Sequence, residues 1–323
     1  MDFRSVGIKM TRLADAVASV IVGRRETIEY VVVALFAGGH VLLEDVPGTG
    51  KTVLAKTLAR AVGGKFSRIQ ATPDLLPSDI TGLSVFNQRT GEFEFVRGPA
   101  FANILLVDEI NRATPRTQSA LLESMEEGQI TEGGVTYALE DPFFVIATQN
   151  PIETQGTFPL PEAQLDRFLM QLSMGKTDEA EAMEILDRFI GGSPLEQVEP
   201  CLEAAEIATD RAVIAAVHVS PPVRQYIAAL TQATRAGKDV LLGASNRGML
   251  RLLRAAQALA VLRGRSYVLP DDIKALFLPV YRHRVIFSGA AGFLTADAEA
   301  RVGELLRSVP APTEDAGSFE APE

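Results

Sequence analysis

The first half of the chain alternates short, continuously apolar runs with segments in which apolar residues recur at helical spacing. A continuous apolar run of this length between turn signals is typical of a strand that is buried on both faces. Such strands alternating with helices predict an α/β fold, with a mostly parallel five-stranded sheet in an αβα core. The expected strands are HVLLE (40–44), FSRIQA (66–71), FANILLVDE (101–109), FFVIATQN (143–150) and FLMQLSM (168–174).

Helices and two hairpins are expected between these strands. Helical spacing covers residues 9–20 and 24–37, and TVLAKTLARAV after Lys51. A further helix is predicted after Thr114 as N-cap, with Pro115 at its first position and Gly128 just past its end. Alternating residues around a turn in SVFNQRTGEFEFVRG and in GQITEGGVTYALED predict two hairpin inserts.

The pattern changes near residue 176, after which only helical segments and Gly/Pro/Ser connectors follow. We therefore expect an αβα core at 1–175 and a second, all-helical domain at 176–308. The last segment, 309–323, is acidic and rich in Pro, Ala and Gly, and we expect it to be disordered.

A phosphate-binding loop is predicted between the first strand and the next helix. EDVPGTGKT (44–52) matches G-x-x-x-x-G-K-[ST] except at its first position, where Asp45 replaces glycine. Backbone N–H groups of the loop and the N-terminus of the following helix favour an anion. Lys51 would reach the β- and γ-phosphates, and Thr52 would ligate Mg²⁺. We expect Asp45 to avoid positive φ and to keep its carboxylate clear of the phosphates.

Polar residues at two other strand ends complete a candidate site. Asp108 and Glu109 follow the apolar run ILLV, and Asn150 ends VIATQN. Because the carboxyl ends of parallel strands meet at one edge of a sheet, one site could gather all three residues with the loop. Asp108 would hold Mg²⁺, Glu109 would polarise the attacking water, and Asn150 would orient it. Read in isolation, the acids could be a solvated strand end and Asn150 a turn residue.

Composition narrows the function classes further. The net charge of −10 disfavours a broad nucleic-acid surface. A single cysteine, Cys201, excludes an internal disulfide, and His40, His218 and His283 are too scattered for a metal site, so we expect structural roles for them. No apolar run is long enough to span a bilayer, and the first residues lack a signal-peptide core, so the expected location is cytoplasmic.

The segments EDVPGTGKT, ILLVDEINRATPRTQSALLESMEEG, ATQNP, EAQLDRF and GASNRG together resemble the MoxR family of AAA+ ATPases, in order over roughly residues 15 to 290. The resemblance implies ATP as cofactor with Mg²⁺, a P-loop core with a lid, and assembly into a hexameric homo-oligomeric ring. It also implies a protein client and a partner that carries a von Willebrand factor A domain.

Several residue roles follow from this resemblance. Asn150 corresponds to the sensor-1 residue, Arg167 to the arginine finger that reaches a neighbouring subunit, and Arg247 to the sensor-2 arginine; the alternative for Arg167 is an ion pair with Asp166 or Glu162. Arg112 and Arg116 are candidates for the subunit interface. The remaining nucleotide-binding candidates are Val22 and Gly23, which would pack on adenine, Pro47, Gly48, Thr49 and Gly50 of the loop, and Val53 of the helix that follows.

Three function hypotheses stay open from the sequence. The first is an ATP-driven remodeller of protein clients of the MoxR type. The second is a nucleotide-dependent switch or scaffold in which hydrolysis only times partner release. The third is a nucleic-acid motor, which the balanced charge of the first hairpin disfavours, since Arg89 and Arg97 are matched by Glu92 and Glu94.

Overall fold

The core of the protein is a five-stranded sheet in which every pair of neighbouring strands is parallel, in the order β2–β5–β8–β1–β9. The computed structural model describes residues 2–46, 48–151, 156–237, 239–288 and 296–312. All five predicted strands are confirmed, each slightly shorter than expected. They are β1 (Val41–Glu44), β2 (Phe66–Gln70), β5 (Ile104–Asp108), β8 (Phe144–Gln149) and β9 (Met170–Leu172).

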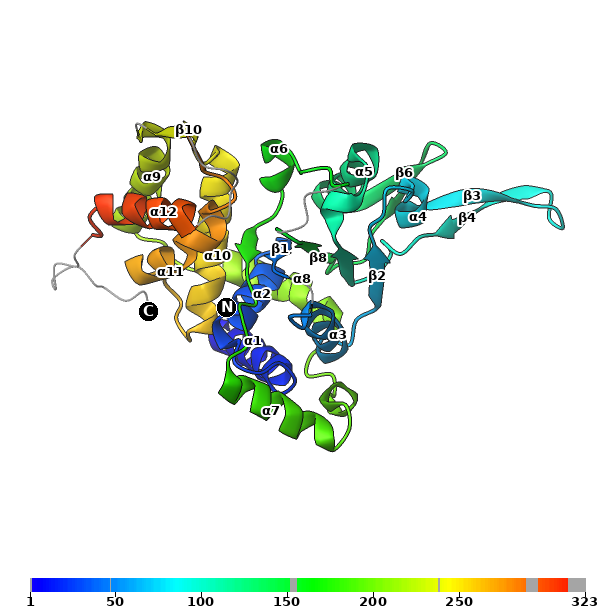
Figure 1. Ribbon diagram of the computed structural model, residues 1–323, viewed down its shortest axis with the longest axis horizontal. Coiled ribbons are helices and arrows are strands. Elements are labelled where there is room, and N and C mark those ends of the chain that lie inside the picture. Colours follow the sequence, from blue (N-terminus) through cyan, green and yellow to red (C-terminus); the bar gives the residue numbers. More distant parts are fainter. Residues whose placement is uncertain (1, 47, 152–155, 238, 289–295, 313–323) are drawn as a thin grey trace.

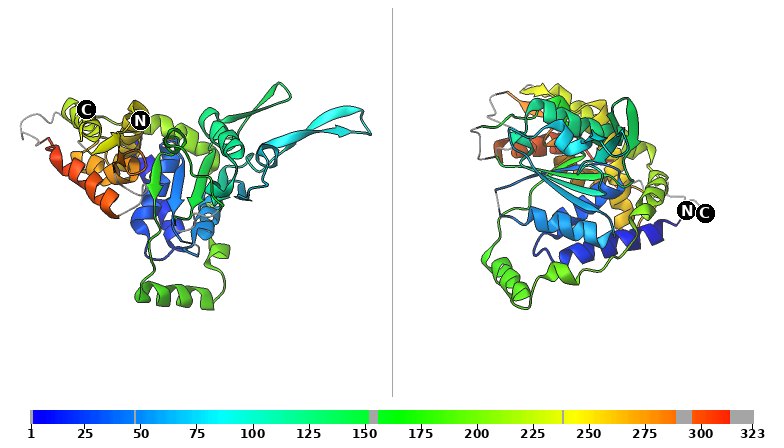
Figure 2. Two further views of the ribbon diagram at one scale, coloured as in Figure 1. Left: turned by 45° about the horizontal axis from the view of Figure 1, so that its top comes forward. Right: turned by 90° about the vertical axis from the view of Figure 1, so that its right-hand side faces the viewer.

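Helices cover both faces of this sheet, as Figures 1 and 2 show. Side chains alternate along each strand, so Ile104 and Leu106 of β5 belong to one hydrophobic cluster and Leu105 and Val107 to another. Burial on both faces explains why the strands read as continuous apolar runs. The first cluster includes α1 (Phe3–Ala18), α2 (Arg25–Phe36) and α3 (Lys51–Ala61), and the second includes α5 (Pro115–Glu127) and the flanking α4 (Pro77–Thr81) and α6 (Glu162–Leu165).

The two predicted hairpins are present and project from the core on the side of α5 (Figures 1 and 2). Strands β3 (Gly82–Asn87) and β4 (Glu92–Arg97) form the longer one, and β6 (Gln129–Glu132) and β7 (Val135–Ala138) the shorter one. The rings of Phe95 and Tyr137 stack with centroids 4.2 Å apart. The hairpins are therefore joined near their bases.

The second half of the described chain is a helical lid, with one feature that the sequence did not predict. A two-stranded antiparallel pair, β10 (Val240–Leu242) and β11 (Ile286–Phe287), lies among the helices. Strands of two or three residues are too short to show a period of two, so the expectation of helices alone missed them. The helices after the sheet are α7 (Glu179–Ile190), α8 (Ala204–Ala215), α9 (Pro221–Ala236), α10 (Asn246–Leu262), α11 (Pro270–Tyr281) and α12 (Ala296–Ser308).

The lid shares its hydrophobic cluster with the N-terminal helices. Helix α1 crosses α10 so closely that a Cβ at Gly7 would lie 2.5 Å from the carbonyl oxygen of Val261. Buried side chains continue from the sheet through α1 and α2 into α10 and α11. The described helices include none that is both long and apolar enough to cross a membrane. The expected disorder of the tail falls largely on residues 313–323, which lie outside the described residues.

His40 joins the beginning of β1 to two other elements. Its Nδ1 accepts a hydrogen bond from the backbone N–H of Val145 at 3.1 Å, so its Nε2 carries the hydrogen and donates to the carbonyl oxygen of Met125 at 2.9 Å. Burial lowers the pKa of His40 from 6.5 to about 4, and the bond to Met125 only partly opposes this effect. The ring is therefore neutral and structural at pH 7.

This buried histidine predicts a loss of stability in mild acid. The folded-state pKa is depressed, so the stability is present above pH 6.5 and is lost as the pH falls toward about 4, because only the unfolded chain takes up the proton. At pH 5 the loss that is due to His40 should be about 2 kcal/mol. In His40→Gln the decrease in the free energy of urea unfolding between pH 7.5 and pH 5 should be smaller by that amount. His218→Gln, at an exposed histidine, is the matched control; an unchanged pH dependence in His40→Gln would contradict the assignment.

Candidate active site

A cavity of about 390 Å³ lies at the carboxyl ends of the central strands. The polar residues that the sequence placed at these strand ends meet there, as does the predicted phosphate-binding loop. The predicted site residues that line the cavity are Gly48, Thr49, Gly50, Lys51, Thr52, Val53, Asp108, Glu109 and Asn150. Pro47 lies outside the described residues.

The loop between β1 and α3 has the backbone conformation of an anion-binding cradle. Gly48 and Gly50 both have φ of 87°, a left-handed region that side chains with a Cβ rarely adopt. A Cβ built at either glycine has no neighbour within 4 Å, so conformation rather than crowding requires glycine here. Gly50 is the N-cap of α3, whose first N–H groups and dipole favour negative charge. An open cradle of this kind fits a chain of phosphates.

Lys51 lies across the loop. Its Nζ donates hydrogen bonds to the carbonyl oxygens of Asp45 at 2.8 Å and Val46 at 3.1 Å. Burial lowers the pKa of Lys51, while the carboxylates of Asp45, Asp108 and Glu109 act in the opposite direction. The ammonium group therefore sits at the mouth of the cradle, where a phosphate oxygen can replace the carbonyl partners.

Asp45, which replaces the expected glycine, takes part in a different contact. Its φ is not positive, as predicted, because Glu109 alone among the described non-glycine residues has a positive φ. Its carboxylate accepts hydrogen bonds from the hydroxyl of Ser173 at 2.6 Å and the backbone N–H groups of Met174 at 2.6 Å and Gly175 at 3.3 Å. The carboxylate thus binds the segment after β9, and the backbone of the loop remains the candidate phosphate ligand.

Asp108 ends β5 and is held by two neighbouring strands. Arg68 of β2 donates from Nε to its Oδ2 at 2.7 Å, and the Thr148 hydroxyl of β8 donates to its Oδ1 at 3.4 Å. Thr52 lines the same cavity. A carboxylate and a hydroxyl facing one phosphate cradle are oxygen ligands of the type that Mg²⁺ prefers, so the residues present fit that ion.

Glu109 has an unusual backbone conformation. Its φ of 55° is left-handed, which costs on the order of 1–3 kcal/mol for a residue with a Cβ. Its N–H donates to the hydroxyl of Thr148 at 2.9 Å, which helps to hold this conformation. Its carboxylate contacts Gln70 Nε2 and Arg112 Nε, both at 3.0 Å. A strained, partly exposed carboxylate at the cavity wall is well placed to act on a water molecule.

Three of these contact residues were missed by the sequence analysis, namely Arg68, Gln70 and Thr148. All three line the cavity at the ends of β2 and β8. The rule that strand ends gather at one edge applies to them as well. None of the three, however, is an acid or an amide that follows a continuous apolar run.

Val22 and Gly23, the predicted adenine contacts, lie between α1 and α2 and are not among the cavity-lining residues. A Cβ at Gly23 would lie 2.0 Å from Oε1 of Glu181 on α7, and Arg24 pairs with the same carboxylate at 2.7 Å. Their contact with a base stays a prediction.

Arg167 is also outside the cavity. It donates to the carbonyl oxygen of Leu122 at 2.6 Å and pairs with Glu126 of α5 at 3.0 Å. The alternative partners named from the sequence, Asp166 and Glu162, are wrong, because Asp166 is bound by Arg284 at 2.6 Å. The side chain of Arg167 does not pair with its sequence neighbours, because packing places the last turn of α5 beside it.

Arg247, at the beginning of α10, pairs with the same Glu126 at 2.6 Å. The structure therefore brings the two predicted arginines together. Neither of them lines the cavity that contains the loop. Arg116 is exposed on α5, and Arg112 contacts Glu109; their role at an interface stays a prediction.

Comparisons with known proteins agree with this geometry. Residues 40–170 match the family described as "ATPase family associated with various cellular activities (AAA)", and residues 232–304 match the AAA lid domain. The chain is 46% identical to YeaC of Bacillus subtilis over 94% of this chain and 95% of that protein. It is 41% identical to Chaperone MoxR1 of Mycobacterium tuberculosis, over 94% and 82% respectively. A crystal structure from Cytophaga hutchinsonii superposes with a TM-score of 0.85 at 38% identity, covering 97% of both chains. The chain thus belongs to the MoxR family of AAA ATPases, enzymes that bind and hydrolyse ATP.

Proposed function

We propose that this protein uses ATP hydrolysis to remodel, mature or assemble protein clients. The observation that carries the proposal is the pair of hairpins that project from the same core as the ATP site (Figures 1 and 2). The β3–β4 hairpin exposes apolar side chains, with Phe93 73% and Val96 54% accessible, where a surface away from partners would be polar. Chaperone MoxR1, a 41% identical relative, is named for an activity of this kind.

The roles of the site residues follow from their positions. The loop amides and Lys51 bind the β- and γ-phosphates, and Thr52 with Asp108 would hold Mg²⁺, which supplies charge neutralisation when bound. Glu109 accepts the proton of the attacking water, and Asn150 orients that water. Arg68 and Gln70 hold the two acids in the conformation described above until phosphate and water arrive.

Arg167 and Arg247 act on nucleotide at a subunit boundary. Arg167 contacts α5 and does not line the cavity of its own subunit. We therefore assign it as the arginine finger for the nucleotide of a neighbouring subunit. A head-to-tail contact that is repeated around a closed ring gives every subunit one finger and one site, which fits a homo-oligomeric ring. The hexameric size that we propose for it comes from the family resemblance. Arg112 and Arg116 are further candidates for this subunit interface.

The domain bounds, the partner and the location complete the proposal. The chain divides into a nucleotide-binding core at 1–175 and a lid at 176–308, followed by the acidic tail. A von Willebrand factor A domain protein is the proposed partner, and the cytoplasm, where ATP is available and a lone cysteine stays reduced, is the proposed location. The charge balance of the β3–β4 hairpin, with Arg89 and Arg97 against Glu92 and Glu94, disfavours a nucleic-acid motor.

The assignment of Glu109 as base predicts a variant that binds ATP without hydrolysing it. Glu109→Gln should lower the rate of phosphate release by about 10²–10⁴-fold, the contribution of a general base, with ATP affinity retained. Steady-state phosphate release and equilibrium binding of a fluorescent ATP derivative measure the two properties. Glu123→Gln, an exposed acid of α5, is the matched control. Phosphate release at the wild-type rate from Glu109→Gln would exclude this role.

The finger assignment predicts complementation between two inactive variants. Arg167→Ala and Lys51→Ala should each be nearly inactive alone, since one lacks the finger and the other lacks phosphate binding. When they are mixed at equal concentration, about a quarter of the interfaces in a head-to-tail ring pair an intact loop with an intact finger, so hydrolysis should partly recover. Fluorescence energy transfer between differently labelled variants confirms co-assembly. Recovery that fails in co-assembled rings would rule out action in trans.

Client remodelling predicts capture that depends on bound ATP. Glu109→Gln with ATP should retain a client protein that Lys51→Ala with ATP releases, because only the former holds nucleotide. The recovered client is then incubated with active wild-type protein and either ATP or ADP. Hydrogen exchange of the client measures whether hydrolysis changes its structure. Equal recovery by the two variants would contradict capture that depends on ATP. Identical exchange with ATP and ADP would argue for the switch or scaffold hypothesis instead.

A further inference from the structure

Arg167 and Arg247 form ion pairs with one and the same carboxylate, that of Glu126 in the last turn of α5. A guanidinium nitrogen of Arg167 lies 3.0 Å from Oε2, and one of Arg247 lies 2.6 Å from Oε1, so each oxygen serves one arginine. The arginines come from separate parts of the chain, after α6 in the core and at the beginning of α10 in the lid. Glu126 is therefore the point at which the two catalytic candidates meet.

Positive charge exceeds negative charge at this point. Arg251, one turn after Arg247 on α10, is held partly buried, and burial together with the charge of Arg247 lowers the pKa of Arg251, against the effect of Asp166 and Glu126. Asp166 is itself already paired with Arg284. A cluster of guanidinium groups that shares one available carboxylate is a receptor for an anion.

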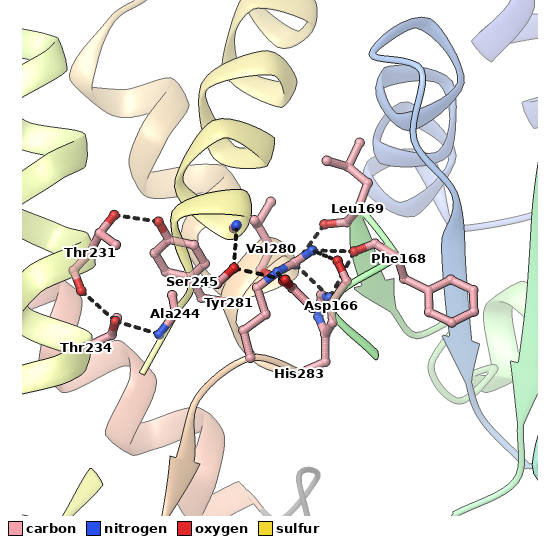
Figure 3. Close-up of polar contacts among 12 residues, drawn as sticks. Asp166, Phe168, Leu169, Thr231, Thr234, Ala244, Ser245, Val280, Tyr281 and His283 are labelled. Atoms are coloured by element: carbon pink, nitrogen blue, oxygen red, sulfur yellow. Dashed lines mark hydrogen bonds and ion pairs between the residues drawn. The ribbon is translucent and has the colours of Figure 1, made fainter. Parts of the chain in front are cut away.

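The backbone on both sides of the cluster is fixed. His40 binds the carbonyl oxygen of Met125, the residue before Glu126. Asp166, the residue before Arg167, accepts from Arg284 Nε at 2.6 Å and from the Ser245 hydroxyl at 2.9 Å, as Figure 3 shows for Asp166 and Ser245.

The same serine is the N-cap of α10, two residues before Arg247, and accepts from the N–H of Gly248 at 3.0 Å. The side chains of Arg167, Arg247 and Glu126 remain 29%, 45% and 31% exposed. Their charged ends can thus change partners while the backbone stays in place.

We propose that Glu126 is a positioning residue: it holds Arg167 and Arg247 together as one anion-binding pair, and it is exchanged for the γ-phosphate of the ATP that a neighbouring subunit binds. A guanidinium fork binds carboxylate and phosphate with the same geometry, so the exchange replaces one set of hydrogen bonds by an equivalent set. Partly exposed ion pairs are weak enough to be displaced, yet breaking them reduces the net affinity for the phosphate. The proposal rests on the proposed function, in which Arg167 acts in trans.

The exchange predicts that removing the charge of Glu126 tightens the binding of ATP but not of ADP, which has no γ-phosphate. Glu126→Gln keeps the shape and one acceptor oxygen. In the assembled protein it should bind a slowly hydrolysed ATP analogue about two- to fivefold more tightly than wild type, with the ADP affinity unchanged. Titration calorimetry of the analogue and of ADP measures both. A general structural role for Glu126 would change the two affinities alike.

Two controls separate this effect from nonspecific ones. Glu127→Gln makes the same charge change one residue later, at an exposed acid that forms no ion pair within the described residues, and should leave both affinities unchanged. Arg167→Ala should weaken the binding of the analogue only, and in that background Glu126→Gln should lose most of its effect. Glu126→Asp, whose shorter side chain cannot serve both arginines, should shift the analogue affinity in the same direction by a smaller factor, and tests the proposal if Glu126→Gln does not assemble.

The outcomes distinguish the two proposals. If Arg167→Ala weakens the analogue while Glu126→Gln and Glu126→Asp match wild type, the exchange is wrong and the finger assignment stands. Weaker analogue binding by Glu126→Gln would also overturn the exchange, because it would mean that the carboxylate only supports the arginines. If Arg167→Ala leaves the analogue affinity unchanged, the trans-acting finger fails, and the exchange fails with it.

Discussion

A buried ion pair between Arg284 and Asp166 connects the lid to the core. The Arg284 side chain is almost fully buried, and burial lowers its pKa to about 10 although Asp166 raises it. A guanidinium group in such surroundings is stable only when its donors are used, and Arg284 also donates to the carbonyl oxygens of Phe168, Leu169 and Val280 (Figure 3). Separating the two parts would leave an unpaired buried charge. The lid and the segment that carries Arg167 are therefore held together.

The predicted catalytic residues fall into two groups in the fold. The loop, the two acids and Asn150 lie at the carboxyl edge of the sheet, where the parallel strands place them. Arg167 and Arg247 lie beside α5, each bonded to Glu126 and fixed next to the Asp166–Ser245 contact. One subunit thus presents a complete phosphate cradle in one place and a pair of arginines in another. In the proposed function, chemistry that needs both groups would be divided between neighbouring subunits, so that hydrolysis would depend on assembly.

The sequence predicts the strands and the first group well, because both follow from local rules. Apolar runs, glycines at positive φ and acids after a buried strand are visible without tertiary structure, and the cavity confirms where Asp108, Glu109 and Asn150 lie. The partners of charged groups are not local. Arg167 pairs with Glu126 from another helix, and Arg68 reaches Asp108 from the adjacent strand, since packing and strand order decide these contacts. The left-handed φ of Glu109 was not predicted either, because the hydroxyl of Thr148 that helps to hold it belongs to another strand.

Strand β9 lies between two contacts that join the phosphate loop to the lid. Before it, Asp166 is bound by Arg284; after it, Ser173 and the N–H groups of Met174 and Gly175 bind the carboxylate of Asp45 at the start of the loop. The aspartate that replaces the first glycine of the loop motif therefore has a positive role, because glycine has no side chain with which to make this contact. In the proposed function, a displacement of the loop by bound phosphate would act on the chain directly after β9, close in sequence to Arg167. The three residues of β9 would then link the phosphate loop of one subunit to the arginines that it offers to the next.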